Sequence, residues 1–259
     1  MLKNFKSAVR DFWDEAPCGT RGIRHPEGSP EFFAQIEKER DEREPFIRDF
    51  ARFDAWKGKR VLEVGFGAGT DLVRFARAGA VLSGIDYTAH AVRLARQRLR
   101  LDGLEGDLRE GDAESLPFED ASFDFVYSWG VIHHTEDTGK AAREILRVTK
   151  PGAQICVMVY NRRSLVALQC WLLNGLLRGK PWVSVEQLLA AHVESPGTHA
   201  YTTDEALNLF LRLEQSSVTP VVTPYDCRLG RRLFLPAWVR ACVPAGLGWF
   251  LVVQGTKPL

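Results

Sequence analysis

The sequence lacks the usual markers of a disulfide-bonded, metal-binding or membrane-spanning protein. Its 259 residues include only five cysteines, with no C-x-x-C pair and no cysteine–histidine spacing typical of metal ligands. An odd number of scattered cysteines, without an apolar leader, favours a reducing, cytoplasmic location. The longest apolar stretch, residues 165–177, is too short to cross a bilayer and contains polar residues. We therefore expect a soluble protein with no bound metal and no membrane span.

An excess of one charge is also missing. Lysine and arginine total 34 against 33 for aspartate and glutamate, which gives a net charge of +1. This balance does not predict a nucleic-acid partner, because binding to a phosphate backbone requires a basic surface. There are no repeats or low-complexity segments. The length suits one large α/β domain or a core domain with a cap, and leaves open whether the protein is a monomer or a homodimer.

The most informative segment is residues 61–71, which read Val-Leu-Glu-Val-Gly-Phe-Gly-Ala-Gly-Thr-Asp. A short apolar run with the composition of a buried strand ends in three alternating glycines, and apolar residues then recur at helical spacing. Glycine allows a sharp turn and lets a ligand lie directly against the backbone. A strand, a glycine turn and a helix N-terminus together predict a nucleotide pocket.

The spacing of the glycines indicates which nucleotide. Thr70 stands where a dinucleotide fingerprint has its third glycine, and no lysine follows as in a phosphate-binding loop. Asp71 at the helix entrance would repel a diphosphate, and Glu63 in the strand adds a second acid suited to a cation. The pattern therefore disfavours an NAD-dependent dehydrogenase. It favours a nucleoside with a positive centre, of which S-adenosylmethionine is the common example.

This segment resembles motif I of the class I S-adenosylmethionine-dependent methyltransferases. The resemblance covers about residues 55–160, and its further motifs are 84–86, 111–113, 123–128, 130–134 and 150–152. The His133-His134 pair after the fourth strand resembles the small-molecule branch that includes the quinone methyltransferases. The resemblance implies a Rossmann-like α/β fold, with a seven-stranded, mostly parallel sheet, helices on both faces and two antiparallel strands that close the sheet.

Strand and helix signals alternate through the middle of the chain, as expected for a parallel sheet whose ligands bind at the carboxyl ends of the strands. We expect strands at 60–64, 80–85, 107–110, 123–128, 153–159, 217–226 and 249–256. We expect helices at 70–78, 88–101, 138–149, 165–176, 185–191 and 202–213. Four parts follow: an N-terminal helical lid (1–54), the cofactor-binding core (55–160), a helical cap insertion (161–199), and a C-terminal helix with edge strands (200–259).

Several residues are expected to bind the cofactor. Asp86 can accept hydrogen bonds from both ribose hydroxyls, although it could instead cap a helix. Asp112 resembles the residue that reads the adenine edge, although it could be a turn aspartate. Trp129 could face the sulfonium or pack in the sheet, and Glu63 could meet the amino group or be a structural carboxylate. The complete expected set is Trp13, Glu63, Gly65, Gly67, Gly69, Asp86, Tyr87, Asp112, Ala113, Ser128 and Trp129.

Methyl transfer is an in-line displacement in which the cofactor supplies the reactivity and the protein supplies alignment, so a base is optional. If a base is used, the candidates are His133, His134, Tyr160 and His192, each of which could instead be structural. The sequence predicts methyl transfer to oxygen or nitrogen of a small-molecule acceptor. The alternatives are carbon methylation of a lipid-like or quinone-like acceptor, and S-adenosylmethionine binding without catalysis. For the lipid-like acceptor, one apolar stripe could wall a tunnel: Leu165, Leu168, Trp171, Leu172 and Leu176.

Overall fold

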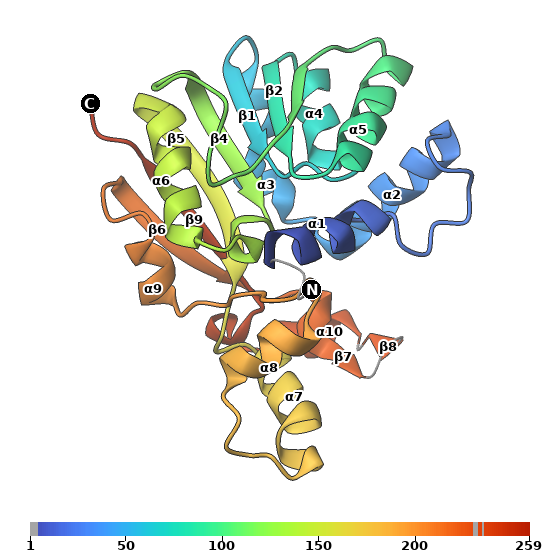
Figure 1. The fold of residues 1–259 in the computed structure, drawn as a ribbon, viewed down its shortest axis with the longest axis vertical. Coiled ribbons are helices and arrows are strands. Elements are labelled where there is room, and N and C mark those ends of the chain that lie inside the picture. Colours follow the sequence, from blue (N-terminus) through green and yellow to red (C-terminus); the bar gives the residue numbers. More distant parts are fainter. Residues whose placement is uncertain (1–4, 230–232, 235) are drawn as a thin grey trace.

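The computed structural model describes residues 5–229, 233–234 and 236–259 and is built around one seven-stranded sheet (Figure 1). The strand order is β3-β2-β1-β4-β5-β9-β6. The first five strands are parallel, and β9 runs antiparallel to both β5 and β6. The bounds are β1 (Arg60–Val64), β2 (Val81–Asp86), β3 (Asp107–Glu110), β4 (Phe123–Trp129), β5 (Thr149–Tyr160), β6 (Glu214–Val221) and β9 (Phe250–Thr256). The predicted fold class is confirmed. Of the two strands expected to close the sheet as antiparallel edge strands, β9 lies between β5 and β6 and runs against both, whereas β6 forms the edge and runs in the same direction as β5.

Helices cover both faces of the sheet, so most side chains of the central strands are apolar and buried. Val61 and Leu62 on β1 are fully buried, and their side chains lie in two separate apolar clusters. The helices on one face are α3 (Ile47–Ala51), α4 (Thr70–Arg77) and α5 (Ala89–Leu101), and those on the other are α6 (Thr138–Val148) and α9 (Thr203–Asn208). Capping hydrogen bonds fix where the helices begin: Thr88 accepts from the Ala91 N–H, and Asp137 accepts from the Lys140 N–H.

The N-terminal segment lies at the carboxyl end of the parallel strands (Figure 1). It consists of α1 (Phe5–Glu15), a loop, and α2 (Pro30–Arg43), which packs on α4 and α5. Phe32, Phe33 and Ile36 of α2 form a small apolar cluster with Ala68 and Leu94. Helix α1 therefore covers the carboxyl ends of the parallel strands.

A second lobe extends from the end of β5 to the lower end of the molecule in Figure 1. It contains α7 (Leu165–Asn174), the short 3-10 turn η3 (Leu176–Arg178), α8 (Val185–His192), η4 (Pro224–Cys227), β7 (Arg228–Leu229), β8 (Leu233–Phe234) and α10 (Ala237–Ala241). None of the described helices combines the length and apolarity that a membrane span requires.

Two predicted elements in the C-terminal part have the wrong extent. The strand expected over 217–226 ends at Val221, because Thr223 and Asp226 form the capping box of η4. The helix expected to reach residue 213 ends at Asn208. No local sequence pattern predicts β7, β8 or α10, which are short and contact η4 or one another.

Candidate active site

The loop between β1 and α4 is a tight glycine turn. Gly65, Gly67 and Gly69 have φ angles of 77°, 51° and 75°, in the left-handed region that side chains disfavour. A Cβ on Gly65 would lie 2.3 Å from the side chain of Val131, and one on Gly67 would lie 3.2 Å from that of Cys18. The turn therefore requires glycine at these positions, and the N–H groups of all three glycines are hydrogen-bonded within the protein.

This turn forms part of a first pocket at the carboxyl ends of β1, β2 and β4. Asp86 of β2 orders the pocket wall, because its carboxylate accepts hydrogen bonds from the Gly67 N–H at 2.9 Å and from the Thr88 N–H at 3.0 Å. Burial raises the pKa of Asp86, and these N–H donors oppose the increase. The main lining residues are Phe5, Lys6, Val9, Trp13, Gly65, Gly67, Asp86, Tyr87, Asp112, Ala113, Trp129 and His134.

Lys6 of α1 ties the N-terminal segment to this pocket. Its Nζ lies 2.7 Å from Asp112 Oδ2 and 2.9 Å from Glu114 Oε2. Burial opposes the charge of the ammonium, but the two carboxylates outweigh it and raise the pKa of Lys6 above its usual range. The ion pairs therefore hold α1 as a roof over the pocket.

A second pocket adjoins the first and contains an ionic cluster. Arg40 of α2 lies 3.1 Å from Glu44 and 2.7 Å from Asp71, and both carboxylates are buried. Trp129 Nε1 also donates to Glu44, at 3.0 Å. The main lining residues are Trp13, Cys18, Arg40, Glu44, Glu63, Gly65, Gly67, Asp71, Trp129, Glu194 and Tyr225.

Glu63 is the acid in this pocket that lacks a partner. Its side chain is buried, and Oε2 has no hydrogen-bond donor among the described residues. Burial, together with the nearby charge of Asp71, raises the pKa of Glu63 well above its usual range. A ligand with an ammonium group would supply the missing donor and positive charge, so Glu63 fits the amino group of an amino-acid ligand.

Asp71, expected to repel a diphosphate at the helix entrance, is paired with groups of the protein. Asp71 contacts Arg40 and also lies 3.4 Å from Arg74, and it accepts a hydrogen bond from the Tyr127 hydroxyl. Its negative charge is therefore balanced inside the protein.

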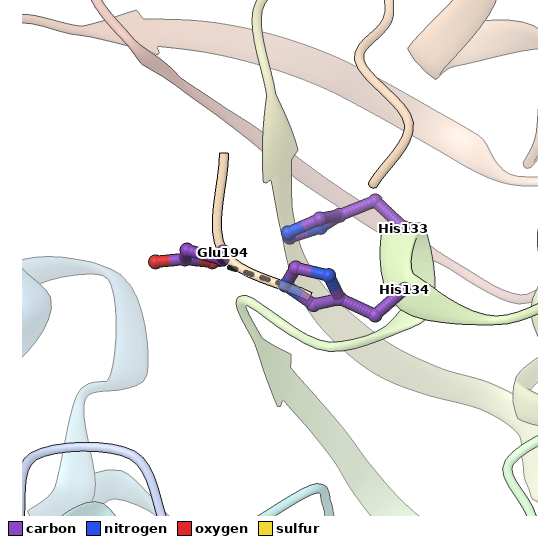
Figure 2. A group of neighbouring side chains, drawn as sticks. All are labelled: His133, His134 and Glu194. Carbon is purple, nitrogen blue, oxygen red and sulfur yellow. Dashed lines mark ion pairs between the residues drawn. The ribbon is translucent and has the colours of Figure 1, made fainter. Parts of the chain in front are cut away.

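His133 and His134 lie on the turn η2 (Ile132–His134) and face Glu194, which follows α8 (Figure 2). His134 Nε2 is 3.2 Å from Glu194 Oε2, and its Nδ1 is 3.1 Å from Thr198 Oγ1. The Thr198 hydroxyl donates to the Ser195 carbonyl at 2.7 Å, so it can only accept from His134. Ser195 Oγ lies closer to the same Nδ1, at 2.9 Å, and its hydroxyl can donate to that nitrogen or accept from it, so these contacts fit a proton on either ring nitrogen.

Glu194 connects His134 to Tyr160, whose hydroxyl donates to Glu194 Oε2 at 2.7 Å. Partial burial would raise the pKa of Glu194, but the hydrogen bonds and charge of His134 hold it below its usual range. The carboxylate thus stays ionised next to Nε2, where it stabilises an imidazolium.

His133 is fully buried against Tyr160, with 4.0 Å between the ring centroids. Neither of its ring nitrogens has a hydrogen-bond partner among the described residues. Burial, with the nearby charge of His134, lowers the pKa of His133 well below its usual range, so this ring is neutral. The ligand atoms of His133, His134 and Glu194 lie within 4.8 Å of one another, which makes them a group that could hold a metal ion.

Comparisons with known proteins agree with this geometry. The family described as "Methyltransferase domain" matches residues 62–157, which include the glycine turn, Asp86, Asp112 and both histidines. The chain is 30% identical to a phosphatidylethanolamine N-methyltransferase of Cereibacter sphaeroides, over 64% of this chain and 75% of that protein. It is also 30% identical to a demethylmenaquinone methyltransferase of Thermobifida fusca, over 60% of this chain and 64% of that protein, which is less than two thirds of its length.

The chain belongs to the class I S-adenosylmethionine-dependent methyltransferases. The predicted family is therefore confirmed. The fold is also that of geranyl diphosphate C-methyltransferase from Streptomyces coelicolor, solved with S-adenosyl-L-homocysteine, with a TM-score of 0.63 over 99% of both chains and 15% identity.

In this methyltransferase, most residues expected to bind the cofactor do line a pocket. The first pocket contains Trp13, Gly65, Gly67, Asp86, Tyr87, Asp112, Ala113 and Trp129, and Glu63 lines the second pocket. Two expected residues line neither pocket: Gly69 caps α4, and the buried Ser128 hydroxyl donates to the Val64 carbonyl at 3.2 Å. The Asp112 carboxylate, expected at the adenine edge, is paired with Lys6.

The four candidate bases are not equivalent. His134 lines the first pocket, whereas His133 and Tyr160 are buried beside it and line neither pocket. His192 is exposed at the end of α8 and is also absent from both pockets. His192 was predicted as a base because it could reach the acceptor, and its exposed position outside both pockets does not support that role.

In the described part of the chain, the apolar stripe of the cap lies outside both pockets. No residue of the stripe lines either pocket, and Leu168 and Leu176 are exposed, because α7 buries Ala167 and Cys170 instead. Lys6, Arg40 and Glu44 line the pockets but were not predicted. These charged residues belong to amphipathic helices or their ends, where charged side chains usually face solvent, so the local sequence does not indicate that they line a pocket.

Proposed function

We propose that this protein transfers a methyl group from S-adenosylmethionine to a small-molecule acceptor that carries an acidic O–H or N–H group. The observation that carries the proposal is the His134–Glu194 pair at the junction of the two pockets. His134 lines the first pocket, Glu194 lines the second, and 3.2 Å separates Nε2 from Oε2. A proton-accepting pair therefore lies between a nucleoside pocket and a neighbouring chamber.

The residues of the first pocket suit the cofactor. Asp86 would hold the ribose, and Asp112 and Ala113 would meet the adenine. Glu63, which lines the adjoining second pocket, would bind the amino group of the methionine portion. When bound, S-adenosylmethionine supplies an electrophilic methyl group and leaves as S-adenosylhomocysteine. The indole rings of Trp13 and Trp129 line both pockets and offer aromatic faces to a cation.

The acceptor would lie in the part of the second pocket near Glu194 and Tyr225. There His134 takes the proton of the acceptor, and the Glu194 carboxylate, 3.2 Å from Nε2, balances the new charge. The lone pair left on the acceptor atom then forms the bond to the methyl carbon. Proton removal of this kind contributes about 10²–10⁴-fold to a rate. Tyr160 acts as a positioning residue, because its hydroxyl holds Glu194 in place.

A second candidate is carbon methylation of a quinol-like acceptor. The same proton removal from a ring hydroxyl makes a neighbouring ring carbon nucleophilic, so one base serves both reactions. Similarity to the demethylmenaquinone methyltransferase supports this candidate.

The test is a screen of phenols, amines and quinols with methyl-labelled S-adenosylmethionine, with cofactor affinity measured separately by calorimetry. We expect His134→Ala to slow turnover at least about 100-fold with unchanged cofactor affinity. The matched control is His192→Ala, whose exposed ring lies outside both pockets and should leave both quantities unchanged. EDTA should not change the rate, because the assigned role of the pair is to carry a proton.

Other outcomes would contradict the proposal. Full activity in His134→Ala would remove the base, and EDTA inhibition reversed by Zn²⁺ would assign the pair to a metal. Tight cofactor binding with no product from any acceptor class would favour a binding protein without catalysis.

A further inference from the structure

Exposed apolar side chains are concentrated on the second lobe. Of the twelve large apolar residues that are exposed in the described part of the chain, seven belong to this lobe. They are Leu168, Leu173, Leu176, Leu177, Trp182, Phe234 and Trp238. Scattered single apolar residues are normal on a protein surface, but a concentration in one region indicates a contact with another apolar phase.

The most exposed part of the lobe is the connection between α7 and α8, residues 176–182, here called the tip. Every residue of the tip is exposed, and its sequence is Leu-Leu-Arg-Gly-Lys-Pro-Trp. The Leu177 and Trp182 side chains are 74% and 77% accessible to solvent. The tip lies at one end of the long axis of the molecule (Figure 1).

The tip is a formed turn, in which Gly179 has a φ angle of 67° and the Lys180 N–H donates to the Gly175 carbonyl at 2.9 Å. The turn therefore holds the leucine and tryptophan side chains outward. Burying two such side chains in a hydrocarbon phase is favourable, because each transfers apolar area out of water.

The charged residues nearest the tip are basic, and the first acidic residue after it, Glu186 of α8, forms an ion pair with Arg162. Residues 163–185 contain Arg163, Arg178 and Lys180 but no acidic residue, and residues 227–259 also contain no acidic residue. The second segment includes α10, which packs on η4, and η4 packs on α7. Because the whole chain is nearly neutral, this is a segregation of charge and not a general basic character.

We propose that the tip docks this protein on the surface of an anionic lipid bilayer. Leu177 and Trp182 enter the boundary between headgroups and acyl chains, where tryptophan is favoured, and Arg178 and Lys180 stay among the anionic headgroups. Cationic residues near such a surface are each favourable, and the attraction is screened by salt. A second copy of the chain fits the tip less well, because two basic tips repel each other and a narrow projection offers little area for a stable interface.

The second lobe also contributes to the acceptor side of the site. Tyr225 of η4 lines the second pocket, and η4 packs on α7, so the lobe connects the tip to the acceptor side of the site. If the proposed function holds, a lipophilic acceptor could enter from the bilayer. The docking itself does not depend on methyl transfer and is measured without cofactor or acceptor.

The experiment is sedimentation of the full-length protein with vesicles of phosphatidylcholine alone and with about one third phosphatidylglycerol. We expect binding to the anionic vesicles at low salt, weak binding to neutral vesicles, and release at about 1 M salt. The double variants L177S/W182S and R178E/K180E should each weaken binding at least about tenfold. Both sets of residues are exposed, so the variants should fold, which their thermal unfolding will check.

Two controls match these changes. Leu211→Ser removes an equally exposed leucine outside the lobe, and R93E/R100E makes the same change in net charge on α5. Both controls should bind as the parent does. No binding to anionic vesicles, or equal loss in the controls, would overturn the proposal. Self-association in ultracentrifugation that disappears in L177S/W182S would instead make the tip a contact between protein copies.

Discussion

His133→Leu should stabilise this methyltransferase, although it removes one of two adjacent histidines next to the site. The His133 ring is fully buried, and both nitrogens lack a partner among the described residues. A buried polar group without a partner costs about 1–3 kcal/mol, and leucine has a similar volume with no polar atom. We therefore expect the free energy of unfolding at pH 7.5 to increase by about 1 kcal/mol.

The difference in stability between His133→Leu and the parent should increase as the pH falls. Burial lowers the pKa of His133 in the folded protein well below the value of about 6.5 expected in the unfolded chain. Below that pH the unfolded chain binds a proton that the folded protein does not, so the parent loses stability as the pH falls. The loss is about 1.4 kcal/mol per pH unit for one group, until the folded pKa is reached. His133→Leu removes this dependence.

The assay is urea unfolding followed by circular dichroism at pH 7.5, 6.5 and 5.5, with His192→Leu as a control at an exposed position. The His133→Leu variant should gain stability relative to the parent at each lower pH, and the control should follow the parent. A variant that is less stable at pH 7.5, or a difference that is constant with pH, would show that the buried ring is satisfied or charged.

Two further predictions concern the ion pairs of the pockets. Lys6→Ala removes the ammonium between Asp112 and Glu114, so trypsin should cleave α1 at Arg10 several-fold faster than in the parent. The control Lys38→Ala, on the exposed side of α2, should not change the cleavage rate. Equal cleavage of the parent and both variants would mean that other contacts hold α1. Arg40→Met removes the cation paired with the buried Glu44 and leaves Asp71 with the longer contact to Arg74, so the free energy of unfolding at pH 7 should fall by about 3–5 kcal/mol in urea titrations. Unchanged stability would show that Arg40 is not needed to balance these carboxylates.

The parts of the fold that follow from local sequence were predictable. The strand at 60–64, the glycine turn and the helix that begins at Thr70 depend on residues within a few positions of one another. The same holds for the alternation of strand and helix up to residue 160, which sets the parallel sheet. The motif residues reached the pockets because the carboxyl ends of parallel strands meet at one edge.

The rest depends on contacts between distant parts of the chain. Lys6 meets Asp112 across 106 positions, and Tyr160 meets Glu194 across 34, and neither pair leaves a local pattern. The apolar stripe of α7 shows a different limit. Helical spacing indicates that one face is apolar, but it does not say whether that face meets a core, a tunnel or the outside of the protein.

The central claim is that the first pocket binds S-adenosylmethionine through Asp86, and calorimetry with the Asp86→Asn variant tests it most directly. Asparagine keeps the shape of the side chain but loses one acceptor oxygen, so we expect the cofactor to bind the parent at one site and the variant at least about tenfold more weakly. Asp107→Asn, on the exposed strand β3, serves as the control and should bind as the parent does. Equal affinity in Asp86→Asn and the parent would contradict the account.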